Sequence, residues 1–419
     1  MRVLFLVDNV PAMEMFEGVI KSLPPGSESV FINYGEWTRQ SRNAIGKCAE
    51  KMAIRCDLMG THSRVGVASI LRQENPDIVV MAREETTPIE SRVLQLCRKR
   101  GTPTLLVPHG VILKGGESIW GVSRRIPRLH HFRLLLRQGK RKLLKGDKSP
   151  QSVLRLLRTG LFRIRNDFQI SGVLSRYTNY TQVASYGEAM SGVLVAFGVS
   201  PERIAITGNP KFDALWRTTY KNRINGNGRH TSWGRPTVLL VTDYLVEFGM
   251  WSEQQRRDYV LSALKVVTDL RQVRGYEFAE LVIKIHPVNE CVADYDKILR
   301  STAVKVYKDA PIADLLPDCD VVITLLSAAG VEAMAAGKPL IIYDPYNNTS
   351  PYREEDGAFV AHDPEELRSV LETVVAGEIG QDRMEKAKDF VYKQAYLQDG
   401  KAADRISDLI IKMVKERAQ

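Results

Sequence analysis

The 419-residue sequence contains few cysteines, and their spacing argues against two classes of protein. No two of them form a C-x-x-C motif and their number is odd, so neither a disulfide framework nor a zinc site is indicated. We expect reduced thiols that pack in the interior. The cysteines are Cys48, Cys56, Cys97, Cys291 and Cys319.

Long apolar runs are also absent. No stretch approaches the roughly 18 uninterrupted apolar residues that a membrane span requires. The first residues, MRVLFLVDNVPAMEMFEG, have an apolar run too short for the core of a signal peptide and are typical of a first β-strand. We therefore expect a cytoplasmic protein that does not cross a bilayer.

Several motifs of nucleotide and metal binding are missing as well. The sequence has no Walker A loop, no G-x-G-x-x-G after the first strand and no recognisable set of metal ligands, and neither of its D-x-D runs, at 294–296 and 318–320, stands out as a metal site. We expect neither a metal ion nor a resident cofactor.

The net charge of +10 is concentrated in one segment. Residues 124–165 contain 14 Lys or Arg and a single acid, whereas the rest of the chain has 45 bases and 48 acids. Leucines recur there near helical spacing with arginines largely on other faces, which is typical of an interfacial helix on anionic lipid. The alternative is a helical hairpin that packs its leucines on the N-terminal domain. Nucleic-acid binding is disfavoured, because only Phe132 and Phe162, besides histidines, could stack on bases.

Short β-branched runs alternate with helical stretches along the rest of the chain, which predicts parallel α/β sheets. The length favours two domains, and residues 220–236, YKNRINGNGRHTSWGRP, have the composition of a linker. We predict a doubly wound domain over 1–222 with a basic helical insertion at 124–166, and a second over 236–419 that includes the C-terminal helices. Ligands of such sheets bind outside the carboxyl ends of the strands, here in a cleft between the domains.

The stretch LLSAAGVEAMAAGKPLIIYD, residues 325–344, carries candidate binding residues. A strand ends near Leu326, and Gly330 opens a helix whose N-terminal N–H groups suit a phosphate, with the Ser327 hydroxyl beside them. In the first turn, Glu332 could accept two hydrogen bonds from a ribose diol. The alternative is that Glu332 only complements the helix dipole.

The segment VIKIHPVNE places a histidine at the carboxyl end of another strand. The proline after His286 ends strand pairing, so its imidazole should face the ligand. Lys284 lies two residues earlier, on the same face of the strand, and could add a positive charge. The alternative is a structural histidine.

These segments resemble the GT-B glycosyltransferase superfamily. VEAMAAGKPLIIYD is similar to its C-terminal-domain signature, in which the Glu, here Glu332, holds the nucleotide's ribose. RIAITGNPKFDAL, residues 203–215, is similar to the segment that ends the N-terminal domain in UDP-sugar 2-epimerases and related transferases, which makes Asn209 a candidate binding residue. The His-Pro element resembles that of bacterial transferases with CMP- or CDP-activated donors, where the histidine contacts a phosphate. The resemblance implies a GT-B fold and a UDP- or CMP/CDP-linked donor.

The general base is less well defined. LLVPHGVI resembles the V-x-H-G strand ends of capsule and teichoic-acid polymerases, and His109 could take the proton from an attacking hydroxyl. Its rivals are Asp8, Glu14 and Glu17, at or just after the end of the first strand, and a structural role for His109 is equally compatible with the sequence.

Two departures from the family patterns narrow the chemistry. Retaining GT-B enzymes carry a second glutamate eight residues before the ribose glutamate, where this chain has Thr324, which favours inversion. The 2-epimerases carry an H-R-x-E-N run where this chain has VTDYLVEFG, which disfavours epimerisation. Asp243 and Tyr244 occupy that loop and are candidates to touch a substrate.

The sequence therefore predicts a metal-independent GT-B glycosyltransferase, or a CDP-polyol phosphotransferase-like enzyme. It would transfer a sugar or sugar-like group to a lipid-linked or polysaccharide acceptor in surface glycan biosynthesis, at the inner face of the cell membrane. Two alternatives stay open: a UDP-sugar 2-epimerase-like enzyme, and an inactive membrane-associated GT-B scaffold.

Overall fold

A computed structural model describes most of the chain in two compact units. The residues that the structure describes are 1–34, 39–58, 64–83, 88–108, 177–224, 236–273, 276–277, 279–287, 290–300, 302–348 and 350–418. Within them, the first unit comprises residues up to 108, 177–213 and 399–418, and the second comprises the described residues from 214 to 398. The basic segment 124–165 lies outside the described residues.

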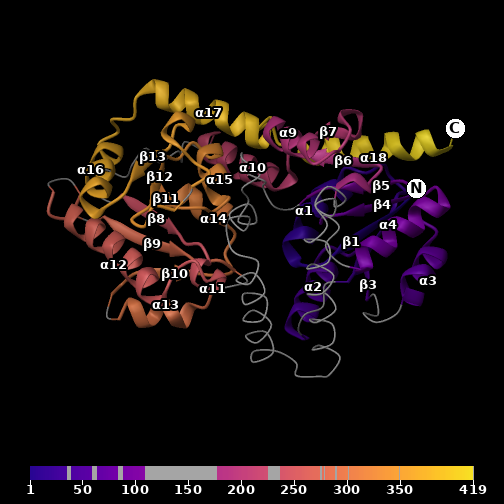
Figure 1. Cartoon of the computed structure of the whole chain (residues 1–419), viewed down its shortest axis with the longest axis horizontal. Helices are drawn as coiled ribbons and strands as arrows, with labels where there is room; N and C mark the ends of the chain where they lie inside the picture. The colour runs from indigo at the N-terminus through magenta and orange to yellow at the C-terminus, as the bar shows by residue number, and fades with distance from the viewer. Residues whose placement is uncertain are drawn as a thin grey trace. The chain divides into compact units, whose positions relative to one another are not determined.

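The first unit is built on a parallel sheet in the order β3-β2-β1-β4-β5-β6-β7 (Figure 1). Its strands are β1 (Arg2–Val7), β2 (Glu28–Asn33), β3 (Arg55–Leu58), β4 (Ile78–Met81), β5 (Thr104–Leu106), β6 (Gln182–Ser185) and β7 (Ile204–Ile206). Its helices are α1 (Val10–Lys21), α2 (Arg39–Lys51), α3 (Arg64–Glu74), α4 (Pro88–Arg100), α9 (Glu188–Ala196), the 3-10 turn η1 (Pro201–Arg203), the start of α10 (Pro210–Ile224) and α18 (Ala402–Ala418).

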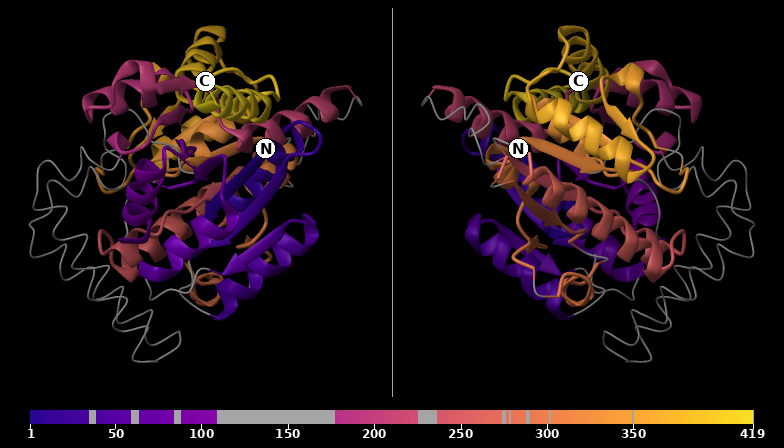
Figure 2. Two further views of the ribbon diagram at one scale, coloured as in Figure 1. Left: turned by 90° about the vertical axis from the view of Figure 1, so that its right-hand side faces the viewer. Right: turned by 90° about the vertical axis from the view of Figure 1, so that its left-hand side faces the viewer.

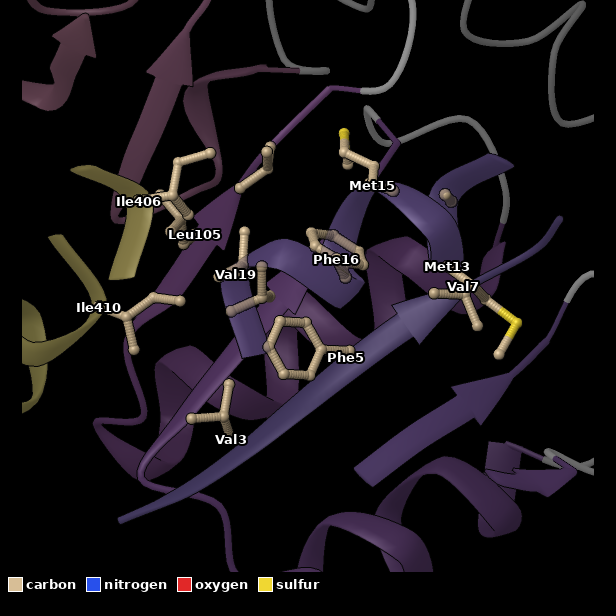
Figure 3. Close-up of a cluster of buried hydrophobic side chains, with 14 of the residues drawn as sticks. Val3, Phe5, Val7, Met13, Met15, Phe16, Val19, Leu105, Ile406 and Ile410 are labelled. Atoms are coloured by element: carbon tan, nitrogen blue, oxygen red, sulfur yellow. The ribbon is translucent and has the colours of Figure 1, made fainter. Parts of the chain in front are cut away.

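Strand β1 is apolar on both of its faces, which explains why helices cover both faces of this sheet. Val3, Phe5 and Val7 belong to one buried cluster, which also contains residues of α1, α2 and α18 (Figure 3). Leu4 and Leu6 belong to the other, with residues of α3, α4 and α9. Side chains of a strand point alternately to opposite faces, so a strand that is apolar throughout requires two covered faces.

The C-terminal helix packs differently from the sequence-based expectation. The second domain was expected to extend to residue 419, but α18 packs on α1 in the first unit, as Figures 1 and 2 let the reader follow from the chain's C-terminus. Ile406 and Ile410 of α18 lie in the same buried cluster as Phe5 (Figure 3). Asp213 accepts hydrogen bonds from the backbone N–H groups of Ala402 (3.0 Å) and Ala403 (2.8 Å), which fixes the start of the helix.

The second unit repeats the architecture in the order β10-β9-β8-β11-β12-β13, again all parallel. Its strands are β8 (Thr237–Val241), β9 (Glu280–Lys284), β10 (Lys305–Tyr307), β11 (Val321–Thr324), β12 (Leu340–Tyr343) and β13 (Phe359–Ala361). Its helices are α11 (Leu245–Phe248), α12 (Glu253–Leu270), α13 (Val292–Ile298), α14 (Ile312–Leu315), α15 (Ala329–Ala335), α16 (Pro364–Val375) and α17 (Gln381–Ala395), with 3-10 turns η2 (Leu316–Asp318) and η3 (Glu354–Asp356). Helices α12 and α16 lie side by side (Figure 2).

Candidate functional site

The candidate site lies at the carboxyl ends of β9, β8 and β11, three neighbouring strands of the second sheet. The chain proceeds from β8 to β9 on one side and returns to β11 on the other, so the strand order reverses between β8 and β11. Ligands of open α/β sheets bind at such reversal points. The segments that leave these three strands contain Asp243, His286 and Ser327.

Asp243 joins the two strand ends at the reversal point. Its Oδ2 accepts a hydrogen bond from the backbone N–H of Leu326, at 2.9 Å, so the carboxylate after β8 fixes the loop after β11. Burial raises the pKa of Asp243 to about 7, and the negative charge of Glu290 acts in the same direction. Asp243 thus positions the loop before α15, a task that the sequence analysis did not assign to it.

A small pocket opens beside Asp243. Two of the polar atoms around it, Nε of Arg256 and Oη of Tyr259, are buried and have no hydrogen-bond partner among the described residues. The mostly apolar surroundings account for the raised pKa of the Asp243 carboxyl. The lining residues are Thr242, Asp243, Leu245, Val246, Trp251, Arg256, Tyr259, Tyr295 and Leu325.

His286 follows β9, as the sequence predicts, and is half-buried. Its ring meets that of Tyr244 edge to face, with the centroids 4.5 Å apart. Burial lowers the pKa of His286 to about 4, and the nearby ammonium groups of Lys284 and Lys308 lower it further. The imidazole is therefore neutral at pH 7 and offers one N–H donor rather than a positive charge.

Lys284 has a structural task in addition to its charge. Its buried ammonium donates to the backbone carbonyls of Ile285 and Lys308, both at 2.8 Å, and so ties the end of β9 to the end of β10. The spacing of Lys284 and His286 in the sequence predicted that both would face the ligand. The structure shows the two carbonyl contacts instead, while the charge still acts on His286 at a distance.

The backbone N–H groups at the start of α15, which the sequence predicted to bind a phosphate, donate hydrogen bonds within their own turn. The N–H groups of Ala329 and Gly330 donate to Oγ (3.3 Å) and O (3.0 Å) of Ser327, and that of Val331 donates to Ala328 O. These groups therefore already have partners and are not open for a phosphate. The Ser327 hydroxyl accepts from Ala329, which leaves its own hydrogen for donation.

Gly330 has a packing role that the sequence did not reveal. A Cβ atom at this position would lie 2.5 Å from Cζ of Tyr352, a distance that real Cβ atoms do not show. The Tyr352 hydroxyl donates to Ser327 O at 2.5 Å, so the ring covers the turn and requires a residue without a side chain beneath it.

Glu332 lies in α15, as predicted, but the residue is only 4% exposed. The sequence motif predicted a carboxylate that lies open towards a ribose. In this structure it is buried, so ribose binding by Glu332 would need the surrounding side chains to move.

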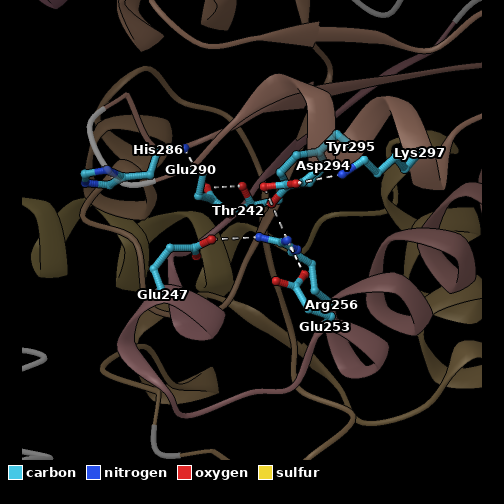
Figure 4. A network of polar contacts seen from close by, with 9 residues as sticks. All are labelled: Thr242, Glu247, Glu253, Arg256, His286, Glu290, Asp294, Tyr295 and Lys297. Atoms are coloured by element: carbon cyan, nitrogen blue, oxygen red, sulfur yellow. Dashed lines mark hydrogen bonds and ion pairs between the residues drawn. The ribbon is translucent and has the colours of Figure 1, made fainter. Parts of the chain in front are cut away.

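Sequence reasoning missed Glu290. This carboxylate is 2% exposed and accepts hydrogen bonds from Thr242 Oγ1 (2.7 Å), from the His286 backbone N–H (2.6 Å) and from Tyr295 Oη (Figure 4). A signal was present: in HPVNE the acid stands four residues after the histidine, within reach of its backbone N–H.

The proposed bases of the first unit fall into three different situations. Asp8 follows β1 and is 8% exposed; its Oδ2 is paired with Arg83, and its Oδ1 accepts from Asn9 Nδ2 at 2.7 Å. Both oxygens of Asp8 thus already have partners in the folded unit. Glu14 lies on the exposed side of α1, and His109 lies outside the described residues.

Asn209 directly precedes α10. It belongs to the first unit and is 1% exposed. Its Oδ1 accepts from the backbone N–H of Lys211 at 3.0 Å, which is the contact of a helix-starting turn. The T-G-N-P segment thus has a structural explanation.

The described residues show neither a metal site nor a membrane-spanning helix. No group of three or more His, Cys, Asp or Glu is placed to hold a metal ion there. No helix in the same residues is long and apolar enough to cross a membrane.

The raised pKa of Asp243 predicts a pH-dependent effect of Asp243→Asn on stability. The folded-state pKa, about 7, exceeds the unfolded value near 4, so the folded chain binds the proton more tightly. The contribution of Asp243 to the free energy of unfolding of the wild type therefore falls as pH rises from about 4 to about 7. Asp243→Asn does not titrate, so its free energy of unfolding should rise relative to wild type by up to about 1.4 kcal/mol per pH unit over that range. Urea unfolding at pH 5 and pH 8 measures the difference; equal differences at both would refute the assignment.

Comparison with known proteins places these observations in context. Residues 258–345, which run from α12 to just beyond β12, match the family model of capsule polysaccharide biosynthesis proteins. A search of curated proteins finds no match.

Solved structures match over nearly the whole chain. The UDP-GlcNAc 2-epimerase of Neisseria meningitidis bound to UDP-GlcNAc is 13% identical, with a TM-score of 0.57, and the match covers 99% of this chain and 100% of that one. The Methanocaldococcus jannaschii 2-epimerase in complex with UDP-GlcNAc and UDP is 14% identical, with a TM-score of 0.57, and the match covers 98% of this chain and 100% of that one. A variant of the wall teichoic acid polymerase TagF soaked with CDPG is 14% identical, with a TM-score of 0.59, and the match covers 100% of this chain and 89% of that one.

At these identities the likeness establishes the fold. The chain has the GT-B fold, with two doubly wound α/β units, and the sequence-based expectation of this fold is confirmed.

Proposed function

We propose that this chain is a glycan-biosynthesis enzyme of the GT-B type that transfers a sugar or sugar-like group from a nucleotide-activated donor. The observation that carries the proposal is the neutral imidazole of His286 at the carboxyl edge of the second sheet, inside the stretch that matches capsule biosynthesis proteins. TagF and the 2-epimerases, which share the fold, were solved with CDPG and with UDP-GlcNAc. A nucleotide donor linked to UDP, CMP or CDP is therefore the expected substrate.

The donor's phosphate would bind between His286 and the loop that follows β11. His286 would donate one hydrogen bond from its ring, and Ser327 would donate another from its hydroxyl. Lys284 and Lys308 would contribute positive potential at the same edge, since they already act on the imidazole. These groups can take up negative charge on a leaving phosphate without a metal ion.

The acceptor would be a lipid-linked or polysaccharide hydroxyl, and inversion is the expected outcome because Thr324 replaces the second glutamate of retaining enzymes. His109 is the leading candidate to remove the hydroxyl proton. In the first unit both oxygens of Asp8 are already engaged, which favours His109 over Asp8.

A 2-epimerase is the second candidate, because epimerases are among the structural neighbours. The segment 241–249 lacks the histidine and arginine of the epimerase motif, which argues against it. Incubating the full chain with UDP-GlcNAc alone and recording ¹H NMR spectra separates the two. The proposal predicts an unchanged donor without an acceptor; a 2-epimer signal would contradict it.

The basic segment 124–165 suggests that the enzyme works on an anionic membrane surface. Each Lys or Arg near such a surface contributes about 1 kcal/mol, so neutralising one should weaken binding about five-fold. Co-sedimentation with vesicles of 30% phosphatidylglycerol, compared with Arg155→Gln and Arg158→Gln, measures this. Equal sedimentation with neutral phosphatidylcholine vesicles would rule out the attraction of these charges to anionic lipid.

A further inference from the structure

A single buried carboxylate, Glu290, holds together the ends of β8 and β9, two of the three strands that carry the candidate site. One oxygen of Glu290, Oε2, accepts from both Thr242 Oγ1 (2.7 Å) and the His286 backbone N–H (2.6 Å). The other, Oε1, accepts from Tyr295 Oη (Figure 4). The three donors come from the loop after β8, the loop after β9 and helix α13.

The bonds to Glu290 lie just beyond the last backbone hydrogen bond between β8 and β9. The backbone N–H of Thr242 donates to Lys284 O at 3.0 Å, which closes the pairing of β8 with β9. Beyond that point the backbones part, and Glu290 Oε2 becomes the bridge between them. The main chain of His286 is therefore set relative to β8 by this carboxylate.

A second layer of contacts fixes the Tyr295 side of the bridge. The guanidinium of Arg256, a residue only 3% exposed, lies 5.4 Å from the centre of the Tyr295 ring. Arg256 is paired with Glu247 at 2.9 Å and with Glu253 (Figure 4). Burying a carboxylate is costly unless hydrogen bonds compensate it. A packing role alone would not require a charge with donors from three separate segments.

We propose that Glu290 is a positioning residue of the donor site: it holds the main chain of His286 so that the imidazole meets the donor's phosphate. The inference depends on the proposed function, because it requires His286 to contact a phosphate. Glu290 itself is only 2% exposed, so it would act on the donor through His286.

Substitution by glutamine tests this role. Glu290→Gln keeps the size of the side chain but removes its charge. The amide oxygen can still accept from Thr242 and the His286 N–H while the NH₂ group donates to Tyr295 Oη, but hydrogen bonds to a neutral oxygen are weaker than those to a carboxylate, so the main chain of His286 is held less firmly. Calorimetry on the full chain first shows whether wild type binds UDP or CDP. We expect Glu290→Gln to bind that nucleotide about ten-fold more weakly, while its binding of the corresponding nucleoside, uridine or cytidine, is unchanged. In a His286→Asn background the same substitution should cause no further loss, because coupled residues are not additive.

Asp320→Asn is the matched control. Asp320 Oδ2 also accepts a backbone N–H, that of Thr237 at 2.7 Å, but at the amino end of β8, and this variant should bind like wild type. If thermal melts show that Glu290→Gln does not fold, Tyr295→Phe removes one donor while keeping the carboxylate, and a smaller, equally non-additive loss is expected.

The outcomes separate the inference from the proposed function. If His286→Asn binds both diphosphates as wild type does, the proposed phosphate contact fails. If His286→Asn weakens binding but Glu290→Gln, or Tyr295→Phe in its place, has no effect or an additive one, the positioning role is overturned and the phosphate contact stands.

Discussion

Replacing Gly330 by alanine is expected to destabilise the folded chain by roughly 2 kcal/mol, because the new methyl group would clash with the buried ring of Tyr352. The added Cβ would lie 2.5 Å from Cζ and 2.7 Å from Oη of Tyr352. Tyr352 cannot move away easily, since it is 2% exposed, donates to Ser327 O and packs on Phe390 with the ring centres 5.8 Å apart. Urea unfolding followed by tryptophan fluorescence measures the loss.

Gly192→Ala is the matched control for this prediction. Gly192 lies exposed within α9, and nothing lies within 4 Å of an added Cβ, so alanine should leave stability unchanged or raise it by up to about 1 kcal/mol. Combining Gly330→Ala with Tyr352→Leu should cost less than the sum of the two single changes. If Gly330→Ala were as stable as Gly192→Ala, the glycine would not be explained by Tyr352, and close approach of a ligand would become the better explanation.

His286→Asn is expected to weaken binding of UDP or CDP, whichever the chain binds, by about 10- to 100-fold. A hydrogen bond to a charged group contributes about 1.5–3 kcal/mol, and the imidazole supplies such a bond to the phosphate in the proposed complex. Binding of the corresponding nucleoside, which has no phosphate, should not change. Calorimetric titration of both ligands measures the two effects separately.

The same substitution should not damage the fold. Because the folded-state pKa of His286, about 4, lies below the unfolded value near 6.5, the unfolded chain binds the proton more tightly, and wild-type stability from this group falls as pH drops from 6.5 towards 4. The free energy of unfolding of His286→Asn, relative to that of wild type, should thus be higher at pH 5 than at pH 8.

His362→Asn is the control for the binding experiment. His362 is an exposed histidine after β13, and this variant should bind the nucleotide like wild type. Equal binding by the two variants would refute the role of His286.

Much of the fold could be predicted from the sequence, because each parallel strand appears as a short apolar run. The runs at 237–243 and 319–327 contain β8 and β11, and the two-unit GT-B fold follows from their order. The position of α18 could not be predicted. An amphipathic helix shows which face is buried but not against what, and Ile406 and Ile410 found their partners in the first unit.

The candidate site was predicted less completely, since it depends on contacts between distant residues. Strand geometry placed His286 at the end of β9, whereas nothing local indicated that the Lys284 ammonium would bind the carbonyl of Lys308. The burial of Glu332 depends likewise on its packing in the folded unit. Gly330 resembled a ligand-binding glycine until its contact with Tyr352, 22 residues later, was known.

The central claim is that the carboxyl edge of the second sheet binds a nucleotide, and a thermal-shift titration of the full chain with UDP, CMP, CDP, GDP and dTDP tests it most directly. A nucleotide at 100 times its dissociation constant adds about 2.7 kcal/mol to the free energy of unfolding. The account predicts such stabilisation by UDP, CMP or CDP, reduced in His286→Asn. No stabilisation by any of the five, or an equal effect in the His286→Asn chain, would contradict it.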